Sequence, residues 1–264
     1  MKYFIDTEYH NYKRQPLFSK EFNTIELISI GIVSENGRKY YAISKEFDLK
    51  AAWKNEWIRK NVLSEIWSDF YFNVYKVSAR LLGVRHAHLP DKEFNLKSLM
   101  WIINQYGKSN QQISDEVKDF CIYNCDGIAT SELDWNKGTI IHFNDTIPPA
   151  KQSVIDLMEK HNCKYVYSAK PEFYGYYSDF DYVVFSQLFG SFENYPKGFP
   201  MYFNDLKQLS DELENKLGYD VDAKGNSYPF SKHPNYPKQL NEHNALADAI
   251  WQQQLYNFLQ NYII

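Results

Sequence analysis

The chain is expected to form an α/β fold in which helices flank a mixed central β-sheet. Strand-like segments come first along the chain, and helical segments then alternate with shorter strand-like segments, an order typical of this fold class. The length of 264 residues, with 44% hydrophobic and 23% charged residues, is ordinary for a globular protein with a sizeable core. We therefore predict one domain over residues 1–264, with an inserted, partly helical segment at about 68–147, where the sequence signals are mixed.

Three N-terminal segments, residues 2–6, 24–35 and 39–44, are predicted strands because aromatic and β-branched residues dominate them. The dipeptide Asn36-Gly37 lies between the second and third segments. Both residues tolerate a positive φ angle, which the tight turns of two-residue hairpins require. The sequence therefore predicts an antiparallel hairpin over 24–44.

The rest of the chain alternates between segments with apolar residues at helical spacing and short strand-like segments. Apolar residues at helical spacing, prolines at a first turn and a glycine after a last turn predict helices at 51–67, 112–123, 148–161, 182–189, 204–217 and about 244–260. Short strands are predicted at 139–143 and 164–169, and 173–177 is either a strand end or a turn. Residues 220–239 are rich in Gly, Pro, Asn and Ser, and we expect a loop there.

Charge and cysteine content narrow the class of protein. The net charge of −4 provides no global basic field, so a nucleic-acid ligand would need local patches or bound metal. The 17% aromatic content has two readings, packing in the core or stacking on nucleobases. Three cysteines form neither a disulfide framework nor a zinc-ligand pattern. With no apparent leader peptide and no apolar run long enough to span a bilayer, we expect a cytoplasmic protein without membrane contact.

The first strand ends in the sequence Asp6-Thr7-Glu8. Side chains alternate along a strand, so Asp6 and Glu8 are expected on the same face. Two carboxylates held this close repel each other unless a cation or a proton lies between them. Hard divalent cations prefer oxygen ligands, so the pair indicates an Mg²⁺ or Mn²⁺ site, although an isolated acidic pair is more often a solvated surface feature.

Two further motifs contain acidic residues. Phe180 is flanked by Asp179 and Asp181 before a predicted helix, and His243 precedes Asp248 by five residues at the start of the last helix. An aspartate before a helix is also a common cap, so each motif has a purely structural alternative. Five positions along a helix would separate His243 and Asp248 by about 140°, so the two side chains converge only if His243 lies at or before the helix start.

In this order the motifs resemble those of the DEDDh exonuclease family. The segment TIELISIGIV at 24–33 is similar to the second strand of that family, and the hairpin after it is in the matching place. The chain is most similar to a small bacterial and phage exoribonuclease branch related to RNase T and oligoribonuclease. The resemblance covers residues 1–67 and about 148–264, and it implies a ribonuclease H-like fold.

The resemblance implies metal-dependent 3′→5′ hydrolysis of single-stranded RNA from its 3′ end, with release of nucleoside monophosphates. Two Mg²⁺ or Mn²⁺ ions would be held by Asp6, Glu8, Asp181 and Asp248, and His243 would be the general base. Asp181 matches the second motif better than Asp179. A 3′–5′ DNA exonuclease, or a nucleic-acid-binding module with a degenerate site, is the alternative.

The resemblance also extends to substrate contacts and assembly. Thr7 and Asn244 are candidate substrate-binding residues. Glu26 is either a contact to the terminal nucleotide or a residue that supports the site. A homodimer is compatible with the family, and the sequence itself does not select an oligomeric state.

Overall fold

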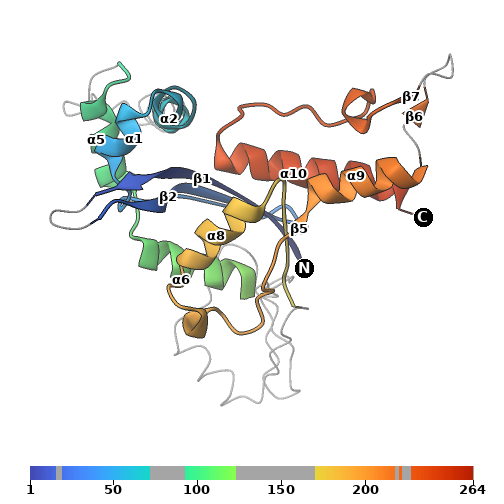
Figure 1. Cartoon of the computed structure of the whole chain (residues 1–264), viewed down its shortest axis with the longest axis horizontal. Coiled ribbons are helices and arrows are strands. Elements are labelled where there is room, and N and C mark those ends of the chain that lie inside the picture. The colour runs from blue at the N-terminus through green and yellow to red at the C-terminus, as the bar shows by residue number, and fades with distance from the viewer. Residues whose placement is uncertain (16–19, 72–92, 123–169, 218–219, 222–226, 264) are drawn as a thin grey trace, which may run out of the picture.

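The computed structural model describes residues 1–15, 20–71, 93–122, 170–217, 220–221 and 227–263 (Figure 1). Its centre is a five-stranded sheet with the strand order β3-β2-β1-β4-β5. The strands are β1 (Lys2–Arg14), β2 (Phe22–Ser34), β3 (Lys39–Ile43), β4 (Glu172–Gly175) and β5 (Asn204–Asp205). β2 pairs antiparallel with both β1 and β3, whereas β4 is parallel to β1 and β5 to β4. The sheet is therefore mixed, which confirms the predicted α/β class and is compatible with a ribonuclease H-like fold.

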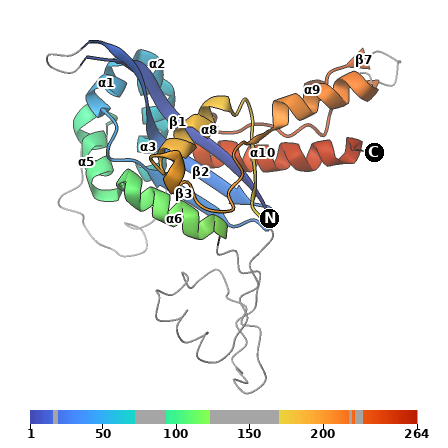
Figure 2. The same ribbon diagram turned by 60° about the horizontal axis from the view of Figure 1, so that its bottom comes forward.

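Helices cover both faces of this sheet (Figures 1 and 2). Helix α10 (Ala245–Leu259) lies on one face, and α6 (Asn110–Ile122) and α8 (Asp179–Gln187) lie on the other. A third group of helices packs at the end of the sheet where β1 and β2 extend as a hairpin. That group consists of α1 (Leu49–Lys54), α2 (Glu56–Ile58), the π-helical turn η1 (Arg59–Leu63), α3 (Ser64–Asp69) and α5 (Leu96–Tyr106).

The remaining described elements lie toward the C-terminus. They are α9 (Leu206–Leu217), the short hairpin β6 (Asp220–Val221) and β7 (Ser227–Tyr228), and the 3₁₀ turns η3 (Phe192–Asn194), η4 (Phe230–Lys232) and η5 (Gln260–Tyr262).

The alternation of side chains along β1 divides the core into two layers. Tyr3 and Ile5 are fully buried in the cluster formed with α6 and α8. Phe4 points the opposite way, into a cluster with residues of α9 and α10. Because the strand repeats every two residues, Asp6 and Glu8 follow Phe4 toward the α10 side. The same alternation that builds the core therefore directs both carboxylates to the face on which α10 begins.

Gly31 sets how closely α10 approaches the sheet. A Cβ atom at this position would lie 2.2 Å from the carbonyl oxygen of Ala245 and 2.4 Å from the backbone nitrogen of Leu246. Backbone atoms cannot move aside as a flexible side chain can, so any larger residue at position 31 would displace the start of α10. Gly31 pairs with Asp6 across the β1–β2 ladder. The glycine thus brings the first turn of α10 close to the strand that carries the acidic pair.

The structure corrects the predicted end of the first strand. β1 continues to Arg14 instead of ending at Asp6, and it pairs with β2 over this whole length. The pairing register shifts between Glu8 and Tyr9, where β2 contains an extra residue, Ile28. Polar residues beyond Glu8 concealed the continuation because they do not show the apolar alternation of a strand that is buried on one face. Bulges of this kind are common beside active sites.

The hairpin between β2 and β3 is confirmed, but its turn differs from the prediction. Gly37 has a φ of +87°, whereas Asn36 is not among the residues with positive φ. The Gly37 amide donates to the Ser34 carbonyl at 2.8 Å, and the Ser34 amide donates to the Arg38 carbonyl at 3.0 Å. The connection is therefore a three-residue loop that ends in one left-handed glycine, a common alternative to the two-residue turn.

The helix predictions are mostly confirmed, with adjusted bounds. The helical segment at 51–67 is divided among α1, α2, η1 and α3, while α6, α8, α9 and α10 lie close to their predicted positions. β5 precedes α9, the loop predicted at 220–239 contains the short β6–β7 hairpin, and the segment 173–177 contributes β4. Helix α5 was not predicted. The elements predicted at 139–143, 148–161 and 164–169 lie outside the described residues.

Candidate functional site

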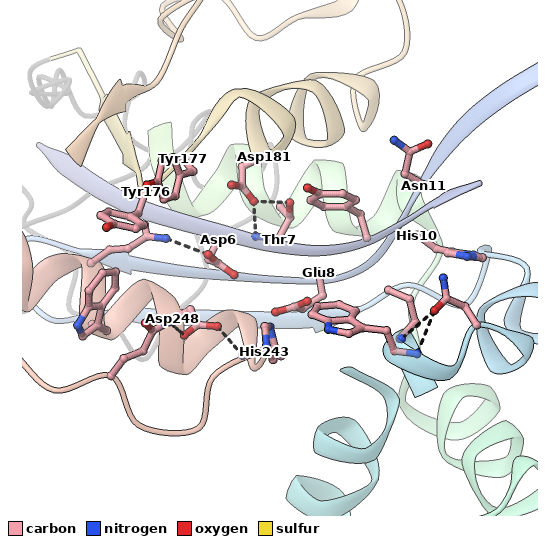
Figure 3. Close-up of a pocket in the computed structure, with 17 residues that line it drawn as sticks. Asp6, Thr7, Glu8, His10, Asn11, Tyr176, Tyr177, Asp181, His243 and Asp248 are labelled. Atoms are coloured by element: carbon pink, nitrogen blue, oxygen red, sulfur yellow. Dashed lines mark hydrogen bonds between the residues drawn. The ribbon is translucent and has the colours of Figure 1, made fainter. Parts of the chain in front are cut away.

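A pocket of about 550 Å³ opens where β1 passes the carboxyl end of β4. It is lined by residues of β1, α2, α8 and α10 and by the segments that lead into α8 and α10. Figure 3 shows the carboxylates of Asp6, Glu8 and Asp248 facing one space, with Asp181 approaching from α8 and His243 beside Asp248. All five residues predicted to carry the chemistry line this pocket.

Three of the carboxylates form a compact group. Asp6, Glu8 and Asp248 each offer an oxygen atom, and these atoms all lie within 4.8 Å of one another. Asp6 and Glu8 project from the same face of β1, and Asp248 lies in the first turn of α10. Acidic residues are favourable in the first turn of a helix because the free amide groups there carry partial positive charge. This cluster could hold a metal ion.

Asp181 reaches the site across an open edge of β1. The last residue of β1 that pairs with β4 is Phe4, and within the described ranges the backbone beyond it has no strand partner on that side. Asp181 supplies one: its Oδ1 accepts hydrogen bonds from the Thr7 amide at 2.8 Å and from the Thr7 hydroxyl at 2.6 Å. Asp181 is buried, whereas Asp179 is exposed to solvent in the same first turn of α8.

The segment before α8 is tied to the neighbouring strand. The Oδ2 atom of Asp205 accepts from the Ser178 amide at 2.7 Å and from the Ser178 hydroxyl at 3.2 Å. Its Oδ1 atom accepts from the Lys207 amide at 2.7 Å, at the start of α9. One carboxylate therefore links the segments that begin α8 and α9, and it helps to fix where Asp181 emerges.

His243 lies before the start of α10, as the helical geometry requires. The helix begins at Ala245 with Asn244 as its N-cap, and His243 has a left-handed backbone with a φ of +68°. Its backbone amide donates to Asp248 Oδ2 at 2.9 Å. Its imidazole ring meets the indole of Trp57 edge to face, with 4.8 Å between the ring centroids. The turn before the helix thus places the imidazole over the pocket, beside Asp248.

The three residues predicted to bind substrate lie in different surroundings. Thr7 lines the pocket, but its hydroxyl donates to Asp181. Asn244 is buried; its Oδ1 caps α10 through the Ala247 amide, and its Nδ2 donates to Asp69 of α3. Glu26 does not line the pocket and accepts from the Tyr12 hydroxyl and the Asp48 amide. Direct contact with substrate remains a prediction for all three, and the hydrogen bonds of Asn244 and Glu26 are those of structural residues.

Burial raises the pKa of all four carboxyl groups at this site, and repulsion from the neighbouring carboxylates adds to the shift for Asp6 and Glu8. Burial, with repulsion from Asp248 and Asp181, raises the pKa of Glu8 to about 8. Burial raises the pKa of Asp181 to about 6, although hydrogen bonds from Thr7 oppose the shift. Burial, followed by repulsion from the neighbouring carboxylates, also raises the pKa of Asp6, and burial raises that of Asp248. Without a cation, the folded protein therefore retains protons in this pocket.

The donors in the pocket suit a hard divalent cation. None of the described residues that line it is lysine or arginine, so neither of these side chains neutralises the carboxylates there. Carboxylate oxygens are the preferred ligands of Mg²⁺ and Mn²⁺, and a bound divalent ion would displace the retained protons. The chemistry of the donors thus fits divalent metal use.

The structure adds two glutamines that the sequence did not reveal. Gln252 Nε2 donates to Asp6 Oδ1 at 2.9 Å, and Gln239 Nε2 donates to Asp248 Oδ1 at 2.6 Å. Gln252 lies four residues after Asp248 on α10, so helical spacing could have indicated it. Gln239 belongs to a loop, where no periodicity marks it.

Aromatic side chains form part of the pocket wall. Trp57 and Tyr177 line the pocket and are 53% and 66% exposed, respectively. The side chain of Asn55 caps α2 by accepting from the Trp57 amide at 3.1 Å, which fixes the start of the helix that carries the indole. The exposed positions of these two rings favour stacking on nucleobases as their role. Most of the other aromatic residues pack in the core.

The raised pKa values predict how the stability of the metal-free protein depends on pH. Between pH 4.5, the ordinary pKa of a glutamate, and about 8, folded Glu8 keeps a proton that the unfolded chain releases. The free energy of unfolding should therefore fall as pH rises through this window. We expect the melting temperature of the wild type in EDTA to decline relative to Glu8→Gln between about pH 5 and about pH 8. If the difference in melting temperature between the two proteins did not change with pH, the raised pKa of Glu8 would be contradicted.

Comparisons with known proteins give a partial match. No protein-family model matches the chain. Two curated relatives, each called a 3′-5′ exoribonuclease and each from a strain of Mycobacterium tuberculosis, are 47% identical over 66 residues. The match covers 25% of this chain and 33% of each relative, so it spans about a third of the length of these proteins. It supports likeness to a 3′–5′ exonuclease family at a coarse level.

One structural finding concerns membranes. Among the described residues, no helix is both long and apolar enough to cross a bilayer.

Proposed function

We propose that the protein is a metal-dependent 3′→5′ exoribonuclease that releases nucleoside monophosphates from single-stranded RNA. The observation that carries the proposal is the convergence of Asp6, Glu8, Asp181, His243 and Asp248 in one pocket, from three distant parts of the chain. The names of the two partial relatives support the choice of RNA and of the 3′ end. The DEDDh family, and within it the branch related to RNase T and oligoribonuclease, is part of the proposal.

The proposed role of each carboxylate follows from its position in the pocket. Asp6, Glu8 and Asp248 would hold divalent cations through oxygen atoms that already lie within 4.8 Å of one another. Asp181 would complete the site from the edge of β1 on the side of β4, oriented by the two hydrogen bonds that it accepts from Thr7. Two Mg²⁺ or Mn²⁺ ions, when bound, would lower the pKa of a water molecule and stabilise charge on the leaving oxygen.

His243 would act as the general base. A histidine is suited to proton transfer near neutral pH because its ordinary pKa is about 6.5. The ring lies at the rim of the pocket beside Asp248, and its packing against Trp57 limits its orientation. The imidazole would take the proton from the attacking water while the carboxylates remain available to cations.

The principal alternative is a 3′–5′ DNA exonuclease with the same site. The catalytic carboxylates would act on either backbone, since a phosphodiester is common to both, and only a contact to the 2′-hydroxyl separates RNA from DNA. A degenerate binding module is less well supported, because all five catalytic candidates are present and gathered in one pocket.

The test is degradation of 5′-labelled single-stranded RNA and DNA of the same sequence, with Mg²⁺, with Mn²⁺ and with EDTA. We expect a ladder of products that shorten from the 3′ end, release of mononucleotides, faster loss of RNA than of DNA, and no reaction in EDTA. A 3′-phosphorylated RNA is a matched control, because it blocks the terminal hydroxyl without changing the sequence. Faster loss of DNA would favour the alternative, and intact RNA and DNA under every metal condition would overturn the proposal.

A further inference from the structure

Gln252 is a polar residue on the side of α10 that buries mostly apolar side chains. It is only 1% exposed, and its neighbours on the buried side of the helix include Trp251 and Leu255. Its Oε1 atom is buried and has no hydrogen-bond partner among the described residues. An unsatisfied buried carbonyl is destabilising, so an apolar residue of similar size would be expected here if packing alone determined the position.

The other end of the same amide has a specific partner. Gln252 Nε2 donates to Asp6 Oδ1 at 2.9 Å. This bond involves one oxygen of the carboxylate and leaves Oδ2 available. An N–H donor fixed in the wall of the pocket at this distance limits how the carboxylate can rotate. The amide therefore orients Asp6 and leaves one carboxylate oxygen for a cation.

The neutrality of the donor matters as much as its position. A lysine or arginine could also hold Asp6, but its charge would compensate the cluster that attracts a divalent ion. A second neutral amide donates to the neighbouring carboxylate, where Asp248 Oδ1 accepts from Gln239 Nε2 at 2.6 Å. Two carboxylates of the cluster are thus held by neutral side-chain amides, and no lysine or arginine is among the described residues that line the pocket.

We propose that Gln252 is a positioning residue of the metal centre, which orients Asp6 for a divalent cation without reducing the negative charge of the site. The inference rests on the proposed function, because it assumes that the carboxylate cluster binds metal. Gln252 itself need not contact the substrate. Side chains that orient metal ligands typically contribute about 10- to 100-fold to metal affinity.

The test compares Gln252→Met with the wild type by calorimetric titration of Mn²⁺ in the absence of nucleic acid. Methionine keeps the length of the side chain and removes both polar groups. We expect Mn²⁺ to bind about 10- to 100-fold more weakly. In EDTA the melting temperature should be equal to or higher than that of the wild type, because the unsatisfied carbonyl is gone. Excess Mn²⁺ should restore nuclease activity in Gln252→Met but not in Asp6→Asn.

Two further variants separate position from charge. Gln254→Met changes the same residue type at an exposed position of α10 and should leave Mn²⁺ binding unchanged. Gln252→Lys retains a donor near Asp6 but adds a positive charge, and it should weaken Mn²⁺ binding more than Gln252→Met does.

The outcomes distinguish the inference from the function on which it rests. Unchanged Mn²⁺ affinity in Gln252→Met, or wild-type affinity in Gln252→Lys, would overturn the inference alone. A Gln252→Met protein that is unfolded or much less stable in EDTA would also overturn it, since that result assigns the residue a packing role. A wild-type protein that binds no Mn²⁺ would overturn both the inference and the metal-dependent function.

Discussion

Replacing Asp6 by asparagine is expected to reduce RNA hydrolysis by about 10³-fold or more, since metal-borne charge stabilisation is worth several kcal/mol and each 1.36 kcal/mol is tenfold in rate. Asp6 belongs to the compact group of carboxylates, and burial, with repulsion from Asp181, Glu8 and Asp248, raises its pKa. The substitution keeps the shape of the side chain and removes one negative charge from the site. Single-turnover hydrolysis of end-labelled RNA at saturating Mn²⁺ measures the loss.

The same substitution should affect stability in the opposite direction. Without metal, Asp6 adds to a buried group of carboxyl groups whose pKa values are all raised. Asparagine relieves that repulsion, so the melting temperature of Asp6→Asn in EDTA should exceed that of the wild type. The matched control is Asp179→Asn, an exposed aspartate in the first turn of α8. Asp179→Asn should change neither the rate of RNA hydrolysis nor the melting temperature appreciably. Wild-type activity in Asp6→Asn would be incompatible with the proposed site.

Replacing His243 by glycine is expected to reduce hydrolysis by about 10²- to 10⁴-fold, the usual contribution of a general base. Glycine is the suitable replacement because position 243 has a φ of +68°, which glycine adopts without strain. Binding of Mn²⁺ should be retained, because the bond from the residue 243 amide to Asp248 belongs to the backbone. Activity should recover in part when imidazole is added in the space left beside Trp57.

A second histidine provides the control for this experiment. His233 packs against Phe258, away from the pocket, and His233→Gln should hydrolyse RNA like the wild type. Loss of Mn²⁺ binding in His243→Gly would assign the imidazole a role in the metal site. Full activity without added imidazole would exclude it as the general base.

Local sequence signals predicted the parts of the fold that depend on local interactions. The hairpin over β2 and β3 was predictable because Asn36-Gly37 lies between two apolar runs, and α10 because apolar residues recur at helical spacing over about 244–260. The expectation that Asp6 and Glu8 share one face of β1 followed from the two-residue repeat of a strand. The position of His243 before the start of α10 followed from the requirement that His243 and Asp248 converge, whereas its left-handed backbone did not.

Features that depend on distant contacts were not predictable in this way. The strand β5 contains two residues, too few for any periodicity, and it exists because Asn204 and Asp205 pair with β4. The continuation of β1 past Glu8 depends on its pairing with β2. Trp57 lies in the pocket because of how α2 packs. Gln239 lies there because of the path of a loop, which no short-range sequence signal predicts.

The contact between Gly31 and α10 bears on how relatives of this chain can be recognised. The carbonyl oxygen of Ala245 lies 2.2 Å from where a side chain at position 31 would begin, so a homologue with the same helix placement must keep glycine there. The constraint links position 31 to the short stretch between His243 and Asp248, more than two hundred residues later in the chain. A search pattern that joins Asp-x-Glu, this glycine and His-x₄-Asp would select for the spacing of strand and helix, and not only for the presence of acidic residues. Such a pattern could find distant relatives of this chain that a comparison of whole sequences overlooks.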